Sequence, residues 1–335
     1  MITIIISALK IIFLLGFLIL IHEAGHLIVA KLCKVKVNEF AIGFGPTIWK
    51  KQGKETKYAL RLIPLGGFCS MEGEEERSEN EGSFSKASIP KRIAIVIAGA
   101  TVNIIFGLLV YFILMSTSST YITNEIDGTI NNYVAEEIGL QKGDKIVELA
   151  GKKIKNKEDL NSIMEKSNGE IINLKIKRND EILEFNIKPT EVNSSYYLGV
   201  TLKQSDKNLI NHLIYGRMET KKFAFSILDN IKMLFTGGVS LDQMMGPVGI
   251  SEAVTKTNGF KEFVYMLALI SLSLGVTNLL PIPALDGGKI LLLIIEAIRR
   301  KPLNEKTEIN IQLIGFSLLI ALSLYVTYND ILRIF

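Results

Sequence analysis

The sequence predicts a polytopic α-helical membrane protein with about four transmembrane helices, a membrane-associated β-hairpin or re-entrant loop, and an extracytoplasmic α+β domain. Apolar residues make up 48% of the 335-residue chain, and they are gathered in blocks. Four blocks are long enough to cross a bilayer as a helix, which takes about 20 apolar residues. Between the second and third blocks lies a polar stretch, rich in Lys, Glu and Asn, that could form a compact domain.

The apolar blocks lie at about 2–29, 93–115, 263–298 and 309–328, and basic residues flank them on alternate ends. By the positive-inside rule, the ends marked by Lys31, Arg92 and Arg299 face the cytoplasm. The N-terminus, the polar domain and the C-terminus are then expected on the outer face. The length of the first block, its lack of a basic N-terminal cluster and its charged residues predict a retained helix rather than a cleaved signal peptide.

The cytoplasmic stretch after the first block is not plainly polar. Phe40–Pro46 and Tyr58–Ile63 are short strand-like runs separated by Gly and Pro, which predicts hairpins. The Gly, Phe and Pro content suggests a β-loop that dips into the membrane, where it must lie against protein or a wet cavity. The acidic run Glu72–Glu81 is interpreted as a solvated loop, with a metal-binding cluster as the alternative. Cys33 and Cys69 are both assigned to the cytoplasmic side, so no disulfide is expected.

The polar domain has short β-branched runs and one helical pattern. Leu174–Arg178 and Glu184–Ile187 alternate with period two across Asn179-Asp180, which is a hairpin signal. With the Gly-Leu-x-x-Gly-Asp-x-Ile run at 139–146, the domain resembles a circularly permuted PDZ domain of the bacterial protease type. Such domains bind extended peptides at a sheet edge. A small β-rich spacer is the alternative.

The expected domains follow from these segments. They are a helix with the HEAGH motif (1–31), a cytoplasmic loop with β-hairpins (32–92), a second transmembrane helix (93–119), a PDZ-like domain (120–200), amphipathic extracytoplasmic helices (201–261), a broken third transmembrane segment (262–298), and a cytoplasmic loop with a fourth transmembrane helix (299–335). The net charge of +4 is spread out, with no basic patch interleaved with aromatic residues, so nucleic-acid binding is not expected.

Two of the three histidines lie in the run His22-Glu23-Ala24-Gly25-His26. One helical turn separates His22 from His26, so both rings lie on one face and can reach one metal ion. Glu23 is placed as a base that would activate a zinc-bound water. Two His and a Glu inside an apolar helix are costly unless they pair, bind a metal or line a wet cavity.

A catalytic zinc usually takes three protein ligands and leaves the fourth position for water. Asp286 is the clearest acidic residue in a later apolar block, within Asn278-Leu279-Leu280-Pro281-Ile282-Pro283-Ala284-Leu285-Asp286-Gly287-Gly288. The two prolines stop the helix, and the Gly pair allows close backbone approach before a new helix starts. Asp286 is expected at the N-terminal end of that helix, where a carboxylate is favoured. The plainer alternative is that Asp286 only caps it.

Together, HEAGH and NLLPIPALDGG resemble the paired signature of the site-2 protease family, and the layout is similar to its bacterial RseP-type members. Stretches at 43–46, 63–68, 99–103 and 246–250 are similar as well. The resemblance implies one Zn²⁺ held by His22, His26 and Asp286, with Glu23 as general base. It also implies that Asn278 holds the substrate backbone or the developing oxyanion. This chain has room for one PDZ-like domain, whereas some relatives have two. The resemblance therefore does not decide how substrates are selected by size.

The family resemblance further implies a multi-pass protein of the bacterial cytoplasmic (inner) membrane, with its active site near the cytoplasmic face. The implied substrates are pre-trimmed single-span membrane proteins, such as anti-sigma factors, and remnant signal peptides, cut in regulated intramembrane proteolysis. The PDZ-like domain would bind or exclude substrate ectodomains, lipid surrounds the helices, and the sequence sets no oligomeric state. Alternatives are an inactive membrane scaffold, a membrane-anchored protease of cytoplasmic substrates, and a transporter with a midplane metal.

Overall fold

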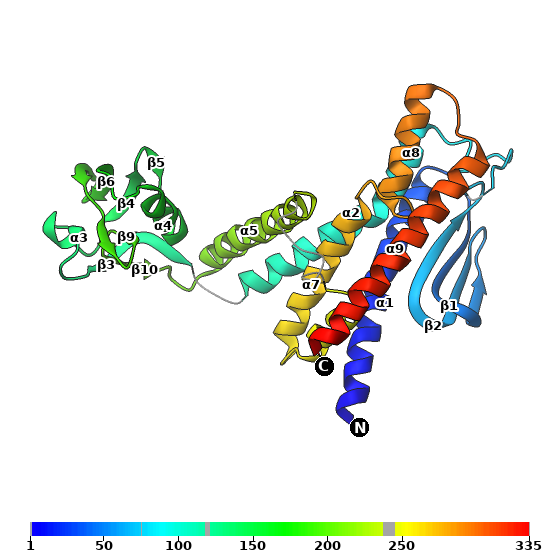
Figure 1. Ribbon diagram of the computed structural model, residues 1–335, viewed down its shortest axis with the longest axis horizontal. Coiled ribbons are helices and arrows are strands. Elements are labelled where there is room, and N and C mark those ends of the chain that lie inside the picture. Colours follow the sequence, from blue (N-terminus) through cyan, green and yellow to red (C-terminus); the bar gives the residue numbers. More distant parts are fainter. Residues whose placement is uncertain (1, 75, 118–120, 237–244, 335) are drawn as a thin grey trace. The chain divides into compact units, whose positions relative to one another are not determined.

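A computed structural model describes residues 2–74, 76–117, 121–236 and 245–334. The chain divides into two compact units, the first made of Met1–Leu114 with Thr220–Phe335 and the second of Met115–Glu219. The boundary expected at residues 119 and 120 lies outside the described residues. Figure 1 colours both units along the sequence.

The first unit is built mainly from helices. They are α1 (Ile2–Leu32), α2 (Ile89–Ser116), the later part of α5 (Leu209–Phe235), α6 (Pro247–Thr255), α7 (Phe260–Asn278), α8 (Asp286–Arg299) and α9 (Glu305–Ile334). Among the described residues, four segments are long and apolar enough to cross a membrane: Ile6–Leu32, Ile89–Ser116, Phe260–Asn278 and Glu305–Arg333. The protein is therefore a multi-pass membrane protein. Within this unit, α1 begins and α9 ends at the same end (Figure 1), as four crossings require.

The third predicted segment, 262–298, consists of two helices. α7 alone has the length of a membrane span, whereas the 14 residues of α8 rise only about 21 Å. A bilayer core is about 30 Å thick, so α8 is too short to cross it. The helix break therefore lies after a complete candidate span, and Asp286 is the first residue of the shorter helix.

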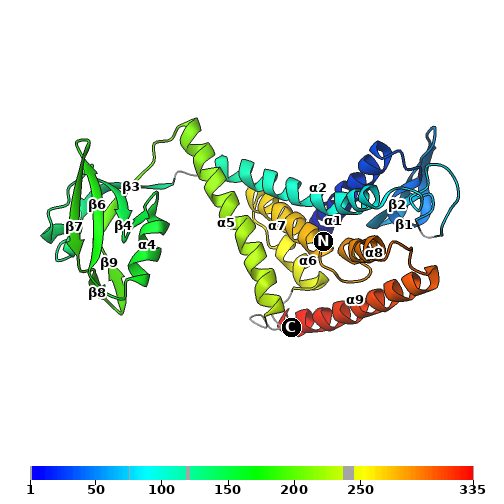
Figure 2. The ribbon, with the colours of Figure 1, turned by 90° about the horizontal axis from the view of Figure 1, so that it is seen from above.

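A long β-hairpin packs against α1, as Figures 1 and 2 show. Its strands are β1 (Val37–Gln52) and β2 (Lys57–Met71). The expected short hairpins are thus one pair of long, irregular strands, in which Ile42 has partners in both halves of β2, Gly67 and Leu60. Gly43 and Gly66 take φ values of +85° and +108°, which lets the strands bend there. Phe40 of β1 packs with Ala30 of α1 and Ile95 of α2 in a common core. Placement of this hairpin inside the membrane remains a prediction.

The second unit is an α+β fold. Its elements are β3 (Ile122–Thr129), α3 (Val134–Glu137), β4 (Lys145–Leu149), β5 (Lys152–Lys153), α4 (Lys157–Lys166), β6 (Ile172–Arg178), β7 (Glu181–Ile187), β8 (Thr190–Val192), β9 (Ser195–Tyr197) and β10 (Val200–Gln204). The main sheet has the order β10-β3-β4-β6-β7, with β5 paired to β4. Side chains such as Ile126, Ile146 and Leu174 form its core and are fully buried.

The predicted hairpin at Asn179-Asp180 is confirmed. β6 and β7 are antiparallel, with Arg178 opposite Glu181. Both turn residues have positive φ, +47° and +69°. Two central residues with positive φ define the type I′ turn, whose twist matches that of the flanking strands.

The amphipathic region expected at 201–261 contains α5 and α6, but its residues 201–204 belong to strand β10 of the main sheet. Its residues 237–244 lie outside the described ones. Phe223 of α5 stacks on Tyr111 of α2 at a ring-centroid distance of 4.0 Å. Tyr265 of α7 lies 6.0 Å from the same Tyr111 ring. The later half of α5 therefore packs against two of the candidate membrane spans, α2 and α7.

Candidate metal centre

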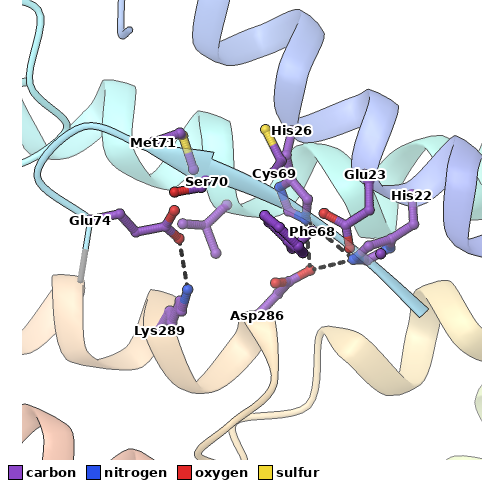
Figure 3. A pocket seen from close by; sticks show the side chains of 12 residues that line it. His22, Glu23, His26, Phe68, Cys69, Ser70, Met71, Glu74, Asp286 and Lys289 are labelled. Atoms are coloured by element: carbon purple, nitrogen blue, oxygen red, sulfur yellow. Dashed lines mark hydrogen bonds and ion pairs between the residues drawn. The ribbon is translucent and has the colours of Figure 1, made fainter. Parts of the chain in front are cut away.

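The HEAGH motif lies in the last third of α1, where His22 and His26 project from the same face (Figure 3). Their Nε2 atoms are 3.2 Å apart, and each residue is only 8% exposed. Residues four apart face the same side of a helix, so this proximity follows directly from the motif.

Asp286 reaches the histidines from the start of α8. The chain leaves α7 at Asn278 and turns through Pro281 and Pro283, and neither proline can continue a helix. A Cβ on Gly287 would lie 2.2 Å from the carbonyl oxygen of Leu280, so only glycine lets the first turn of α8 sit so close to the loop. This close approach is the one expected from the Gly pair.

The loop before Asp286 also contains an unusual backbone conformation. Ala284 has φ +73°, in the left-handed region that costs an L-residue about 1–2 kcal/mol. Such a conformation persists only where the surroundings hold it. The metal-facing carboxylate is thus carried by a tightly turned loop.

The three side chains fit a zinc ion. Asp286 Oδ2 lies 3.2 Å from His22 Nε2 and 3.6 Å from His26 Nε2. Two ligand atoms each about 2.0–2.1 Å from a tetrahedral zinc are about 3.3 Å apart. Apart from these two imidazole nitrogens, the buried Asp286 Oδ2 has no hydrogen-bond partner among the described residues, so a cation between the three atoms would satisfy it. In the described part of the chain, these residues are also the one group of three or more His, Cys, Asp or Glu side chains close enough to share an ion.

The Nδ1 atoms of both rings have hydrogen-bond partners, which leaves the Nε2 atoms free to bind a metal. His26 Nδ1 lies 2.9 Å from the carbonyl oxygen of Ile95 and donates to it. His22 Nδ1 lies 3.3 Å from the side-chain amide of Asn103 on α2, whose Oδ1 is buried without a partner among the described residues. A half-turn of this amide makes Oδ1 the acceptor of the Nδ1 proton, which is the arrangement usual for metal-binding histidines.

Gly99 of α2 makes room for the two rings. A Cβ at this position would lie 2.3 Å from His26 Nε2 and 2.9 Å from His22 Cε1. No real Cβ approaches other atoms so closely, so α2 can contact the histidines only with a glycine here.

The histidines and Asp286 open into a cavity of about 520 Å³. Glu23 lines it, together with five consecutive residues of β2, Gly67–Met71. Successive strand side chains point to opposite faces, so a run of five lining residues means that the backbone edge of β2 borders the cavity. On the opposite wall, Lys289 of α8 donates to Glu74 Oε1 at 2.8 Å (Figure 3).

Cys69 also lines this cavity, which raises the question of a cysteine nucleophile. Burial, together with the carboxylates of Glu23 and Glu74, raises the pKa of the Cys69 thiol to about 12. Catalytic cysteines need the opposite shift, toward the thiolate. The cavity is thus better suited to an activated water than to a cysteine nucleophile.

The acidic run at 72–81 does not form a second metal site among its described residues. Glu72 instead accepts hydrogen bonds from the side chains of Asn38, Ser78 and Asn80, and these lower its pKa to about 2. Glu75 lies outside the described residues. The solvated-loop interpretation holds for the exposed Glu76, Glu79 and Glu81, whereas Glu72 and Glu74 are mostly buried in side-chain contacts.

Not every residue singled out in the sequence reaches the cavity. His22, Glu23, His26 and Asp286 line it, whereas Asn278, the last residue of α7, is not among the residues that do. Conversely, Asn103 and Gly99 contact the histidine rings, whereas the sequence marked their stretch, 99–103, only as similar to the family and gave neither residue a role. The available signal was Asn103 itself, because polar side chains inside membrane helices are rare and usually functional.

A buried His-Glu-x-x-His helix, a carboxylate as third ligand and a multi-pass membrane architecture define a membrane metallopeptidase. The model of peptidase family M50 matches residues 10–322. The chain therefore belongs to this family, the site-2 proteases, and is a zinc metalloprotease.

Several curated proteins are similar over their whole length. A protein of Clostridium acetobutylicum, described as a candidate zinc metalloprotease, is 37% identical over 321 residues, which cover 94% of each chain. The zinc metalloprotease RasP of Oceanobacillus iheyensis is 29% identical and the regulator of sigma-W protease RasP of Bacillus subtilis is also 29% identical; each alignment covers 97% of this chain and 98% of the relative. A solved PDZ domain of a Listeria monocytogenes SdrC-like protein is 22% identical, with a TM-score of 0.22, over 25% of this chain and 92% of that domain.

Proposed function

We propose that this protein cuts peptide bonds inside the membrane-spanning segments of single-span proteins. The observation that carries the proposal is the position of the His22–His26–Asp286 group. Two of its members lie within the candidate span Ile6–Leu32, flanked by apolar residues. A protease of soluble substrates would not need its metal ligands inside an apolar helix, where polar groups are costly.

In the proposed site, His22, His26 and Asp286 hold one zinc ion and Glu23 acts as general base. When bound, zinc supplies a Lewis acid that polarises a carbonyl and acidifies a water. Glu23, on the helix turn that carries both histidines, is placed in the same cavity to take the proton from the attacking water. It then returns a proton to the leaving amine. No cavity contact supports the predicted substrate-holding role of Asn278, which therefore rests on the sequence alone.

The cavity also suggests how a substrate is presented. A helical substrate hides its carbonyl groups in i to i−4 hydrogen bonds, so the segment must be extended before cleavage. The backbone edge of Gly67–Met71 borders the cavity and offers strand groups to an extended chain. We infer that the substrate adds as a strand to this edge, with its scissile bond beside the three ligands.

The proposed topology places the N-terminus, the second unit and the C-terminus outside the cytoplasmic membrane of a bacterium, with the metal site near the inner face. The basic residues at the end of α1, the start of α2 and the end of α8 support this orientation. We further propose that the second unit is a PDZ-like domain that binds or excludes substrate ectodomains. Its size and its sheet of hydrogen-bonded antiparallel strands are compatible with that role.

The substrate class is proposed from the relatives. One of them is named a regulator of sigma-W protease, a name that is compatible with membrane-bound anti-sigma factors as substrates. We propose pre-trimmed single-span proteins of this kind, and remnant signal peptides, as substrates here. An inactive scaffold is disfavoured because the base, Glu23, is intact in the cavity.

The proposal is tested by cleavage in reconstituted vesicles. The zinc-loaded parent and Glu23→Gln are mixed with a single-span substrate whose outer domain has been trimmed, and the products are mapped by mass spectrometry. The parent should cut within the apolar segment, and the variant should lose at least about 100-fold in rate, as expected for a missing general base. Equal processing by both proteins would refute the protease site, and a cut outside the apolar segment would refute intramembrane cleavage.

A further inference from the structure

We propose that Gln312 of α9 is a positioning residue that fixes the loop carrying Asp286, with Gly315 as the matching contact one turn later. The inference rests on the proposed metal site, because it concerns the placement of its third ligand. It assigns to the fourth candidate span a role in metal binding that its apolar sequence does not suggest.

The first observation is a hydrogen bond to a strained residue. The backbone N–H of Ala284 donates to Gln312 Oε1 at 2.6 Å. Ala284 has φ +73° and lies two residues before Asp286. Because an alanine does not favour this conformation, an outside partner is needed to keep it populated. Gln312 supplies that partner from a helix 28 residues further along the chain.

The second observation is the close approach of the α9 backbone to the same loop. A Cβ on Gly315 would lie 2.4 Å from Pro283 Cβ and 2.5 Å from the Pro283 carbonyl oxygen. Gln312 and Gly315 are three residues apart and so share one face of α9. That face contacts consecutive loop residues, Pro283 and Ala284, through a hydrogen bond and through direct packing.

The remaining loop hydrogen bonds are local. Ile282 donates to Leu280, and Leu285 donates to Ile282, both through the backbone. These bonds shape the turn but do not tie it to another helix. The bond from Ala284 to Gln312 therefore anchors the turn to α9, and Asp286 follows directly at the start of α8.

The rest of α9 makes this contact stand out. Only 11% of its most apolar stretch is buried inside the protein, against 28–39% for the other three candidate spans. Because so little of α9 is buried, Gln312 is not needed there to complete a packed core. Its contact with the loop can instead control how Asp286 is oriented toward the histidine Nε2 atoms. Partners of metal ligands act in this way, by fixing geometry.

The matched variants separate positioning from general packing. Gln312→Leu keeps the side-chain size and removes the acceptor, whereas Gln312→Glu keeps an oxygen at Oε1 for the Ala284 N–H. Ser317→Leu is the control, because Ser317 lies on the exposed surface of α9 and its hydroxyl bonds only within the helix, to Leu313. Gly315→Ala tests the second contact independently.

Zinc affinity is measured on the full-length proteins in detergent by competition with a chromophoric chelator, and the visible spectrum of the cobalt-loaded forms reports ligand geometry. We expect Gln312→Leu and Gly315→Ala to bind zinc about tenfold more weakly and to show an altered cobalt spectrum. Gln312→Glu should restore both readouts, and Ser317→Leu should match the parent. Thermal unfolding of the metal-free proteins shows whether each variant is folded.

Parent-like zinc affinity and cobalt spectra in folded Gln312→Leu and Gly315→Ala would overturn the inference. The inference would also be overturned if Gln312→Glu and Ser317→Leu lost as much zinc affinity as Gln312→Leu does. If Gln312→Leu does not fold, Gly315→Ala and Gln312→Glu carry the test. Asp286→Ala is measured in parallel: if it too binds zinc like the parent, the proposed metal site is wrong, whereas a loss confined to Asp286→Ala contradicts only the role of α9.

Discussion

At the scale of single residues, the metal site depends on groups that lie behind the ligands. Each histidine offers Nε2 to the centre and is held at Nδ1, His26 by the Ile95 carbonyl and His22 by the Asn103 amide. A ring held at one nitrogen has a fixed tautomer and a fixed orientation. The HEAGH motif supplies the ligands, but α2 supplies the partners that aim them.

This arrangement predicts the effect of Asn103→Leu. The variant removes the acceptor of the His22 Nδ1 proton while keeping the side-chain size, so zinc affinity should fall by about tenfold. Thr101→Val is the control, because the Thr101 hydroxyl is exposed and bonds only to Ile97 in its own helix. Chelator competition measures both, and equal affinities in the two variants would show that Asn103 does not orient the ligand.

A second residue-scale prediction concerns the second unit. Asp144 is buried, with a side chain 2% exposed, and it accepts two hydrogen bonds of 2.7 Å from Arg178 and one from the Gln141 N–H. Asp144→Asn should lower the free energy of unfolding of this unit by about 2 kcal/mol, the range for hydrogen bonds to charged groups. Asp180→Asn, at an exposed ion pair with Lys177, should change it by less than about 1 kcal/mol.

The same contact sets a pH dependence. Burial alone would raise the pKa of Asp144, but the hydrogen bonds from Arg178 and Gln141 and the guanidinium charge outweigh it, and the pKa is lowered. The stabilisation is therefore complete above the unfolded value of about 3.9 and is lost as the pH falls through the lower folded value. Hydrogen exchange of β4 and β6 in the full-length protein should show this loss in the parent. A parent profile identical to that of Asp144→Asn would contradict the assignment.

At the scale of elements, the crossing of α1 and α2 brings the histidines to their partners. A Cβ on Gly25 would lie 2.7 Å from the Ala98 carbonyl oxygen, so the two helices approach closely at this point. Gly99 on α2 gives the histidine rings their space. The crossing is therefore both a packing contact and part of the metal site.

Gly99→Ala tests this element directly. The added methyl group would lie 2.3 Å from His26 Nε2, so the ring or the helix must move. We expect a loss of zinc affinity of about tenfold or more, the range for disturbed metal surroundings. Gly128→Ala in β3 is the matched control, since its nearest atom would be the Thr201 hydroxyl at 3.2 Å and it lies in the second unit. A Gly99→Ala protein that binds zinc like the parent would contradict the packing.

The elements themselves could be predicted where local chemistry decides them. Apolar blocks marked the four candidate spans, Pro281 and Pro283 marked the end of α7, and Asn179-Asp180 marked a tight turn. Contacts between distant segments could not be predicted in this way. The bond from Gln312 to Ala284 and the contact of Asn103 with His22 depend on how helices cross, and one sequence does not encode that crossing as a local pattern.

At the scale of the whole molecule, a membrane-embedded unit carries the metal site and a separate α+β unit is inserted between α2 and the later part of α5. The site unites residues 22 and 26 with residue 286, which approach only because the apolar helices pack together. The HEAGH and NLLPIPALDGG motifs made it possible to predict, through the family resemblance, that these residues share one site. The sequence predicted only that a β-loop lies against protein or a wet cavity, and not the long hairpin that borders the cavity. Irregular strands with Gly bends give a weak periodic signal.

We infer that the HEAGH helix and the start of α8, far apart in the sequence, build one zinc site. Zinc content and X-ray absorption at the zinc edge, measured on the purified full-length protein and on His22→Ala, His26→Ala and Asp286→Ala, test it most directly. We expect one zinc per parent chain with two imidazole nitrogens and a carboxylate oxygen in its shell, and a marked loss of zinc in each variant. A parent-like zinc shell in Asp286→Ala would contradict it.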